Sequence, residues 1–181
     1  MRICCYGAAS DNIDKSFLDQ GYILGEKMAL RGHSLVFGGG ATGMMGRSAR
    51  GVHNAGGTVI GVAPRFFDKE GVLYQECDEF FWTDTMRQRK QKMQDLSDAY
   101  IVMPGGIGTF EEFFEMITLK SLGQIDQPIA IFNINGYYNK LIEAIEYASE
   151  TKFMYVSPDD IYKSFTDIDE MISYIEGNPK S

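Results

Sequence analysis

The sequence predicts an α/β fold in which helices cover both faces of a doubly wound parallel sheet. Short apolar runs of four or five residues alternate along the chain with longer segments of helical periodicity. Runs such as Ile101–Met103 and Ile129–Phe132 are continuously apolar, which is expected of strands that are covered on both faces. Alternating strands and helices imply right-handed crossovers between parallel strands.

Five apolar runs are expected to be strands, and a shorter sixth run could be another. In chain order they are Arg2–Tyr6, Ser34–Phe37, Thr58–Val62, Glu79–Trp82 (the shorter run), Ala99–Met103 and Ile129–Phe132. Helical patterns follow or separate them at residues 15–31, 43–54, 85–97, 109–122, 137–150 and 167–176. No repeat or Pro/Ser-rich linker divides the 181 residues, so we expect a single Rossmann-like nucleotide-binding domain over residues 1–181. Ligands of such sheets bind beyond the carboxyl ends of the strands, so the loops there are the candidate sites.

The charge balance excludes some partners and permits others. With 17 Lys+Arg and 25 Asp+Glu the formal net charge is −8, which argues against binding a nucleic-acid polymer. Residues 1–92 nevertheless carry 12 basic and 10 acidic side chains (net +2), so a small anion can still find positive charge there. The three cysteines show no disulfide or metal-binding pattern, and neither a signal segment nor an apolar run long enough to span a bilayer is present. We therefore expect a cytoplasmic protein with no membrane partner.

The first glycine-rich loop follows the run Ser34–Phe37 and opens a helix. Gly38-x-Gly40-x-x-Gly43 matches the dinucleotide-binding fingerprint. That fingerprint should be supported by an acidic residue at the end of the next strand, but the segment 58–64 ends without one. The other interpretation is a tight strand-to-helix turn that needs close backbone packing, although this explains only some of the glycines.

The second glycine-rich loop, Met103–Glu112, also joins a strand to a helix. Its glycines allow backbone N–H groups to turn inward, and the helix start adds positive potential, which together suit a phosphate. The loop has no Gly-Lys-Ser/Thr and is therefore not an NTPase P-loop. The spacing Thr109-x-x-Glu112 is equally that of a capping box, which would be compatible with a carboxylate close to the loop.

Four cations lie within six residues of the helical segment 85–97. They are Arg87, Arg89, Lys90 and Lys92. A solvated helix face is the ordinary interpretation, but these side chains cover more than one face of the helix. An arginine is well suited to clamp a phosphate or sugar hydroxyls. Because the segment leads into the strand before the second glycine-rich loop, we expect it to lie near that loop. Neither histidine has metal-ligand spacing, so no metal is expected.

These motifs resemble those of the Lonely Guy (LOG) family. Pro104–Glu112 matches the family signature P-G-G-x-G-T-x-x-E, and the similarity extends over nearly the whole chain, including Gly38–Gly46, Arg89-Lys90 and Gly136–Tyr138. The family consists of cytokinin riboside 5′-monophosphate phosphoribohydrolases, historically labelled lysine decarboxylases. The resemblance implies hydrolysis of the N-glycosidic bond of AMP or an N6-substituted AMP (a cytokinin nucleotide), which releases free base and ribose 5-phosphate without a cofactor.

The resemblance also assigns residue roles. Arg89 and Glu112 are expected to be catalytic, and the expected substrate-binding residues are Gly39, Gly40, Lys90, Gly105, Gly106, Gly108 and Thr109. Breaking the bond builds positive charge on the ribose, which a carboxylate can stabilise, or the carboxylate can activate water. Arg89 would hold the phosphoribosyl group, and the second glycine loop would bind its 5′-phosphate and so position the sugar.

Two departures from the family pattern bear on the preferred substrate. Arg87 stands where the family motif M-H-x-R-K has histidine, and the opening loop Tyr6–Ser10 lacks two hydroxyls of the usual C-G-S-S. A non-catalytic nucleotide or molybdenum-cofactor carrier on the same scaffold remains the alternative, because a carrier needs the phosphate loop but not the Arg89–Glu112 pair. A pyridoxal-phosphate lysine decarboxylase is disfavoured, since no Schiff-base lysine motif is recognisable.

The helical segment 109–122 is unusually apolar. Its large apolar residues are Phe110, Phe113, Phe114, Met116, Ile117, Leu119 and Leu122. Such a helix is either buried inside a large core or shared with a partner. Because the chain is small and its fold is covered on two sides, we expect a symmetric homodimer, as the resemblance also suggests.

Overall fold

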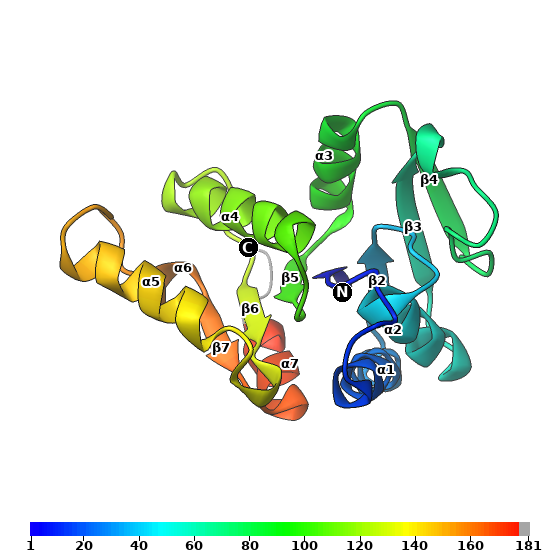
Figure 1. The fold of residues 1–181 in the computed structure, drawn as a ribbon, viewed down its shortest axis with the longest axis horizontal. Coiled ribbons are helices and arrows are strands. Elements are labelled where there is room, and N and C mark those ends of the chain that lie inside the picture. Colours follow the sequence, from blue (N-terminus) through cyan, green and yellow to red (C-terminus); the bar gives the residue numbers. More distant parts are fainter. Residues whose placement is uncertain (178–181) are drawn as a thin grey trace.

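The computed structural model describes residues 1–177, so residues 178–181 of the expected domain lie outside the described residues. Seven parallel strands form one sheet in the order β4-β3-β2-β1-β5-β6-β7 (Figure 1), which confirms the doubly wound α/β class. The strands are β1 Arg2–Tyr6, β2 Ser34–Phe37, β3 Val59–Pro64, β4 Glu79–Thr83, β5 Ala99–Val102, β6 Ile129–Phe132 and β7 Lys163–Phe165. The shorter expected run is therefore a strand, β4, and it forms one edge of the sheet.

The six expected helices are present, with small shifts at their ends. The helices are α1 Lys15–Leu30, α2 Gly43–Asn54, α3 Met86–Leu96, α4 Ile107–Ser121, α5 Asn139–Glu150, α6 Pro158–Ile161 and α7 Ile168–Glu176. Two 3₁₀ turns, η1 Arg65–Phe67 and η2 Ile134–Gly136, follow β3 and β6. The sequence did not predict α6 or β7, because four- and three-residue elements are too short for periodicity to show.

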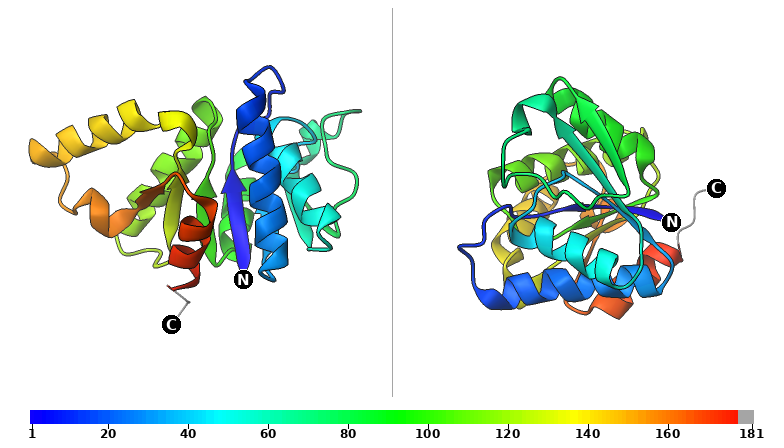
Figure 2. Two further views of the ribbon diagram at one scale, coloured as in Figure 1. Left: turned by 90° about the horizontal axis from the view of Figure 1, so that it is seen from below. Right: turned by 90° about the vertical axis from the view of Figure 1, so that its right-hand side faces the viewer.

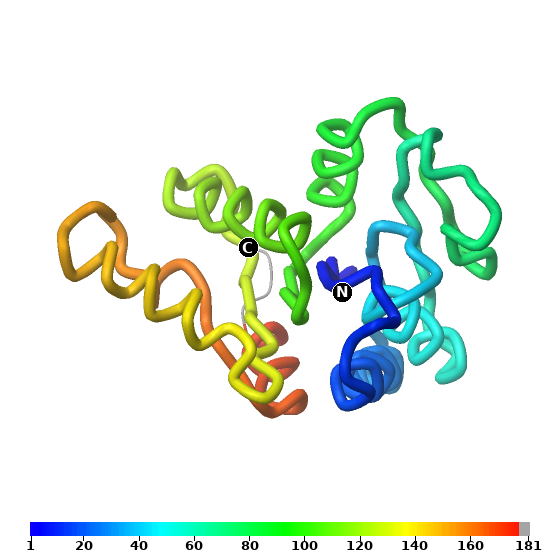
Figure 3. Tube along the Cα trace, viewed as in Figure 1, coloured from blue at the N-terminus to red at the C-terminus, as the bar shows by residue number. Residues whose placement is uncertain are grey.

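Helices cover both faces of the sheet. Alternate residues of each strand point to opposite faces, so Ile3 and Cys5 join the core beneath α1, α2 and α7, while Cys4 and Tyr6 join the core beneath α3, α4 and α5. The trace in Figure 3 shows these two groups of helices on either side of the strands. All four side chains are buried, which explains why the strands are continuously apolar rather than alternating.

Glycines allow α1 and α2 to cross closely. A Cβ at Gly25 would lie 2.1 Å from the carbonyl oxygen of Ser48, and a Cβ at Gly51 would lie 2.1 Å from that of Tyr22. Side chains at these positions would force the helices apart. Close packing of α1 on α2 fixes the position of the first glycine-rich loop, which leads into α2.

The topological switch point lies between β1 and β5. The chain proceeds from β1 through β2 and β3 to β4 on one side, and then from β5 through β6 to β7 on the other. The loops after β1 and β5 meet there, because Ala8 N donates a hydrogen bond of 3.0 Å to the Pro104 carbonyl. The left view of Figure 2 shows β1 running from the N-terminus toward this edge. A crevice for ligands is expected at such a point.

Candidate active site

Arg89 and Glu112 form a buried ion pair. Arg89 Nη1 lies 2.9 Å from Glu112 Oε1, and the two side chains are 7% and 10% exposed. The family resemblance implied that both residues are catalytic, and the helical segment of Arg89 was expected near the second glycine-rich loop, but a direct contact was not predicted. Arg89 belongs to α3 and Glu112 to α4, so the pair joins helices that lie on one face of the sheet (Figure 1). Two charges are kept out of water only where each has a partner, so this contact is built into the fold.

Three features direct Arg89 into this position. A capping box between Thr85 and Gln88, which was not predicted from the sequence, starts α3. Arg89 Nε then donates a hydrogen bond of 3.3 Å to the carbonyl of Val62 in β3. The guanidinium occupies the space left open at Gly38, where a Cβ would lie 1.9 Å from Nη2. Gly38 thus belongs to the site because of its missing side chain.

The surroundings of Glu112 make its carboxyl group a weaker acid than that of an ordinary glutamate. Burial raises the pKa of Glu112, and the attraction and hydrogen bond of Arg89 oppose this without cancelling it. A carboxylate poised in this way, away from bulk water, is typical of acid–base and charge-stabilising groups.

Lys90 lies beside this pair and joins the same two helices. Its ammonium is hydrogen-bonded to Glu111, and Glu115 Oε2 lies 2.8 Å from Nζ. Although burial opposes the charge, the hydrogen bonds to the two carboxylates outweigh it and raise the pKa of Lys90. Lys90 is therefore positively charged next to Arg89, with its charge shared between two acidic partners.

The second glycine-rich loop leads into α4, and the capping-box interpretation of Thr109-x-x-Glu112 is wrong. The helix begins at Ile107 with Gly106 as its N-cap, two residues earlier than predicted, so Thr109 lies inside the first turn. Over the described residues 1–177 no side chain caps this end. The first N–H groups of α4 are thus available to an anion, and the carboxylate of Glu112 binds Arg89 instead.

The geometry of the second loop brings its predicted residues together. Gly105 is required where it stands, since a Cβ there would lie 2.1 Å from Thr109 Oγ1. A Cβ at Gly106 or Gly108 would meet no atom of residues 1–177 within 4 Å, so the loop faces open space. Gly108 and Glu112 are four residues apart and share a face of α4. This places the open helix end one turn from the ion pair.

The first glycine-rich loop is filled by the protein itself at its helix end. The carboxylate of Asp11 accepts a hydrogen bond of 2.9 Å from Gly43 N, and Ala8 O accepts one of 3.3 Å from Met45 N. Because these acceptors occupy the start of α2, a dinucleotide pyrophosphate has no free helix end there. The turn-and-packing interpretation holds here, since Gly43 has a φ of 63°.

Gly39 and Gly40 lie between that helix end and Gly38. Gly39 has a φ of 77°, and its carbonyl accepts a hydrogen bond of 2.8 Å from Tyr74 N. Gly40 pairs with Leu73 in an isolated antiparallel bridge. The structure thus places both predicted residues on the Arg89 side of the switch point, whereas Gly105, Gly106, Gly108 and Thr109 lie on the Glu112 side.

The structure shows where the two departures from the family motifs lie. Arg87 is exposed in the first turn of α3. The opening loop is used through its backbone: Ala8 binds Pro104 and Met45, and Ala9 O accepts a hydrogen bond of 2.6 Å from Thr42 Oγ1. The missing hydroxyls are therefore not needed for the contacts that hold this loop.

The fold and the site define a Rossmann-like protein with an open helix end beside a buried arginine–glutamate pair. A family model described as a possible lysine decarboxylase matches residues 45–175. The cytokinin riboside 5′-monophosphate phosphoribohydrolase LOG4 of Arabidopsis thaliana is 37% identical over 175 residues, which cover 97% of this chain and 81% of that protein. LOG3 of the same plant is 35% identical over 175 residues, which again cover 97% of this chain and 81% of the relative. The chain therefore belongs to the LOG family, as its motifs predicted.

Solved structures share this fold at lower sequence identity. The molybdenum cofactor binding protein of Rippkaea orientalis superimposes with a TM-score of 0.74 at 20% identity, covering 97% of this chain and 95% of the other. The molybdenum cofactor carrier protein of Chlamydomonas reinhardtii gives a TM-score of 0.73 at 19% identity over the same shares. At such identities the likeness establishes the fold alone.

Proposed function

We propose that the protein is a nucleoside 5′-monophosphate phosphoribohydrolase that acts on AMP or an N6-substituted AMP. The observation that carries the proposal is the buried 2.9 Å contact between Arg89 and Glu112, one helical turn from the open start of α4. A phosphate at that helix end would place the attached ribose near the pair. Water adds to C1′ as the N-glycosidic bond breaks, which yields ribose 5-phosphate and the base, and the leaving nitrogen gains a proton.

In this proposal the two catalytic residues have different tasks. Glu112, as a carboxylate, stabilises the positive charge that develops on the ribose or activates the attacking water. Arg89 binds the phosphoribosyl group and keeps Glu112 in place through their hydrogen bond. Both groups act in a site that largely excludes water, where electrostatic interactions are stronger than in solution.

We propose that the remaining predicted residues bind substrate around this pair. Gly105, Gly106, Gly108 and Thr109 surround the open helix end and would bind the 5′-phosphate through backbone N–H groups and the threonine hydroxyl. Gly39 and Gly40 would line the opposite wall. Lys90 would add positive charge that favours the anionic substrate. Binding of the phosphate, which is remote from the broken bond, then positions the sugar.

The test is direct incubation with AMP and isopentenyl-AMP, followed by quantification of free base. We expect wild type to cleave at least one nucleotide and Glu112→Gln to cleave it about 100- to 1000-fold more slowly. If neither nucleotide is cleaved while wild type and variant bind it equally well, the protein is not this hydrolase. Native mass spectrometry of the purified protein serves as the second arm, because a retained nucleotide or pterin would favour a carrier instead.

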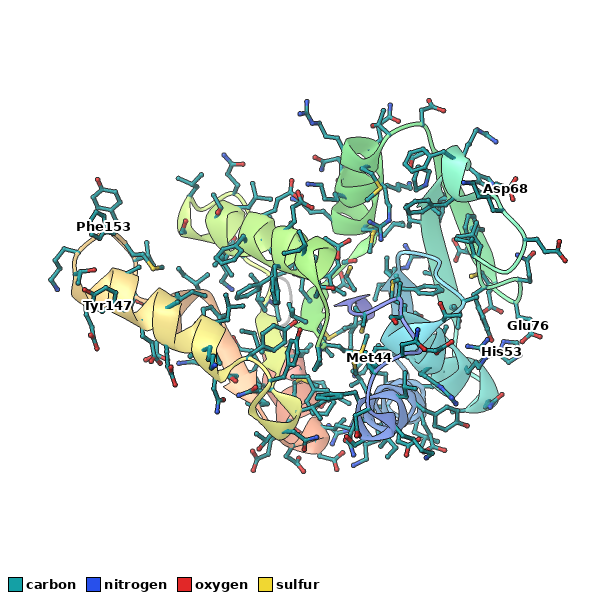
Figure 4. The ribbon with its side chains drawn as sticks, in the orientation of Figure 1. Met44, His53, Asp68, Glu76, Tyr147 and Phe153 are labelled. Atoms are coloured by element: carbon teal, nitrogen blue, oxygen red, sulfur yellow. The ribbon has the colours of Figure 1, made fainter. Side chains whose placement is uncertain are left out.

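We further propose that the active form is a homodimer in the cytoplasm. An apolar groove between α4, α5 and the following segment is lined by Phe114, Ile117, Leu122, Leu141 and Phe153. Leu122 and Phe153 are 65% and 84% exposed, and Figure 4 shows Phe153 at the end of the molecule beyond α5. Exposed apolar patches of this kind mark interaction surfaces. Light scattering should give twice 20.3 kDa, and a monomer alone would contradict the dimer.

Within residues 1–177 no helix is both long and apolar enough to cross a bilayer. The proposed partner is a small nucleotide, and the net charge of −8 argues against nucleic-acid polymers.

A further inference from the structure

Three consecutive carbonyl oxygens of the second glycine-rich loop are held by donors from outside the loop. The hydroxyl of Tyr138 donates to Met103 O at 2.7 Å, and the hydroxyl of Tyr137 donates to Gly105 O at 2.7 Å. Between them, Ala8 N donates to Pro104 O at 3.0 Å. Carbonyl oxygens carry partial negative charge and would repel a bound anion. Because these three oxygens are hydrogen-bonded to neighbouring parts of the protein, they point away from the space where an anion would bind.

Because of peptide geometry, these hydrogen bonds to the carbonyl oxygens also determine where the N–H groups of the loop point. A trans peptide is planar, with its N–H pointing opposite to its C=O, and no cis peptide occurs in residues 1–177. The hydrogen bond to Gly105 O therefore directs the N–H of Gly106 away from Tyr137. In the same way, the bond to Pro104 O directs the N–H of Gly105 away from Ala8.

The segment after β6 presents the two tyrosines in a fixed way. Gly136 has a φ of 71°, and Asn133 Oδ1 accepts a hydrogen bond of 2.8 Å from Tyr138 N. The ring of Tyr137 packs edge-on against Phe17, with ring centroids 5.9 Å apart. Tyr138 is fully buried in the core, whereas Tyr137 is 44% exposed. The hydroxyl of Tyr137 can thus be removed with less disturbance of the core.

We propose that Tyr137 is a positioning residue that sets the phosphate-binding orientation of the Gly105–Gly106 peptide. This positioning role rests on the proposed function in one respect only, which is that the ligand is taken to be the phosphate of a phosphoribosyl group. Without the hydroxyl, the Gly105 carbonyl is free to rotate toward the loop interior, where it would replace an N–H donor with an acceptor that repels the phosphate.

The experiment measures binding of ribose 5-phosphate by calorimetry to wild type, Tyr137→Phe and the matched control Tyr147→Phe. The phenylalanine at position 137 keeps the ring that packs on Phe17, and Tyr147 is 67% exposed on α5, far from the loop (Figure 4). We expect Tyr137→Phe to weaken binding about 3- to 10-fold, the effect of one neutral hydrogen bond, and the control to bind as wild type does. The fitted stoichiometry reports the folded fraction, so lost affinity is distinguished from lost protein.

A second measurement separates this proposal from the proposed function. With AMP as substrate, Tyr137→Phe should raise KM by a similar factor and leave kcat within about 2-fold of wild type, since the hydroxyl acts on binding rather than on the ion pair. Equal affinity of wild type and Tyr137→Phe for ribose 5-phosphate would overturn the positioning role. Weakened binding in a protein that cleaves neither AMP nor isopentenyl-AMP would support the positioning role and refute the hydrolase.

Discussion

The Nη2 atom of Arg89 lies 1.9 Å from the point that a Cβ at Gly38 would occupy. Any other residue at position 38 would therefore compete with the guanidinium for the same space. The first glycine-rich loop contributes to the site in this way, by leaving room for an arginine from another helix, and not by binding a dinucleotide.

Gly38→Ala is expected to lower kcat/KM about 100-fold while the protein stays folded. The far end of a flexible arginine side chain yields more easily than backbone, so the methyl group would displace Arg89 from Glu112, and misplacement of about 1 Å has this effect on catalysis. Steady-state kinetics and thermal melting test this. The matched control is Gly177→Ala, whose added methyl group would meet its nearest atom at 3.4 Å. Full activity of Gly38→Ala would show that Arg89 need not hold this position.

Glu112→Gln is expected to reduce kcat about 100- to 1000-fold, the typical loss when one charge-stabilising group is removed. The amide oxygen can still accept the hydrogen bond from Arg89 Nη1, so the variant should unfold cooperatively like wild type. Glu143→Gln, an exposed change on α5, is the control for loss of a negative charge. Equal losses in the two variants would argue against a catalytic role for Glu112.

The pH dependence of kcat/KM should show an acid limb above pH 4.5. Burial raises the pKa of Glu112 above that ordinary value, and activity needs the carboxylate, so activity falls as pH decreases through the raised pKa. The free energy of unfolding depends on pH in the opposite direction. The stabilising contribution of Glu112 is present below pH 4.5 and is lost as pH rises through the raised pKa of the folded state. Measurement from about pH 4 to about pH 9 tests both, and an acid limb at or below pH 4.5 would contradict the assignment.

Lys90→Met is expected to raise KM for AMP about 10-fold, because it removes one positive charge beside the proposed phosphate site. Stability should also fall by about 1 kcal/mol, since Glu111 and Glu115 lose their shared partner. Kinetics and urea unfolding measure the two effects, with Lys92→Met as a control that removes the same charge from the same helix. Lower stability with an unchanged KM would show that Lys90 only connects α3 to α4 and does not contribute to substrate binding.

The sequence predicted most of the fold because the information is local. Continuous apolar runs identified the strands near their true ends, and glycine-rich segments identified both loops. The expectations that failed concern a helix end whose position depends on a distant partner, and two elements that are too short to show a pattern. The start of α4 at Ile107 rather than Thr109 follows from Glu112 binding Arg89 in place of a backbone N–H. Neither α6 nor β7 has enough residues to show a periodicity.

By itself, the sequence determined the α/β class, the two glycine-rich loops and, through its motifs, the family and the expected pair Arg89 and Glu112. Only the tertiary structure decided which loop has a free helix end. At the first glycine-rich loop the carboxylate of Asp11 accepts a hydrogen bond from Gly43 N, whereas no side chain of residues 1–177 caps the start of α4 at the second loop. It also decided that Tyr137 orients the Gly105 carbonyl from 32 positions away. Such contacts depend on the order of strands in the sheet, which brings distant loops to one edge and which no local pattern records.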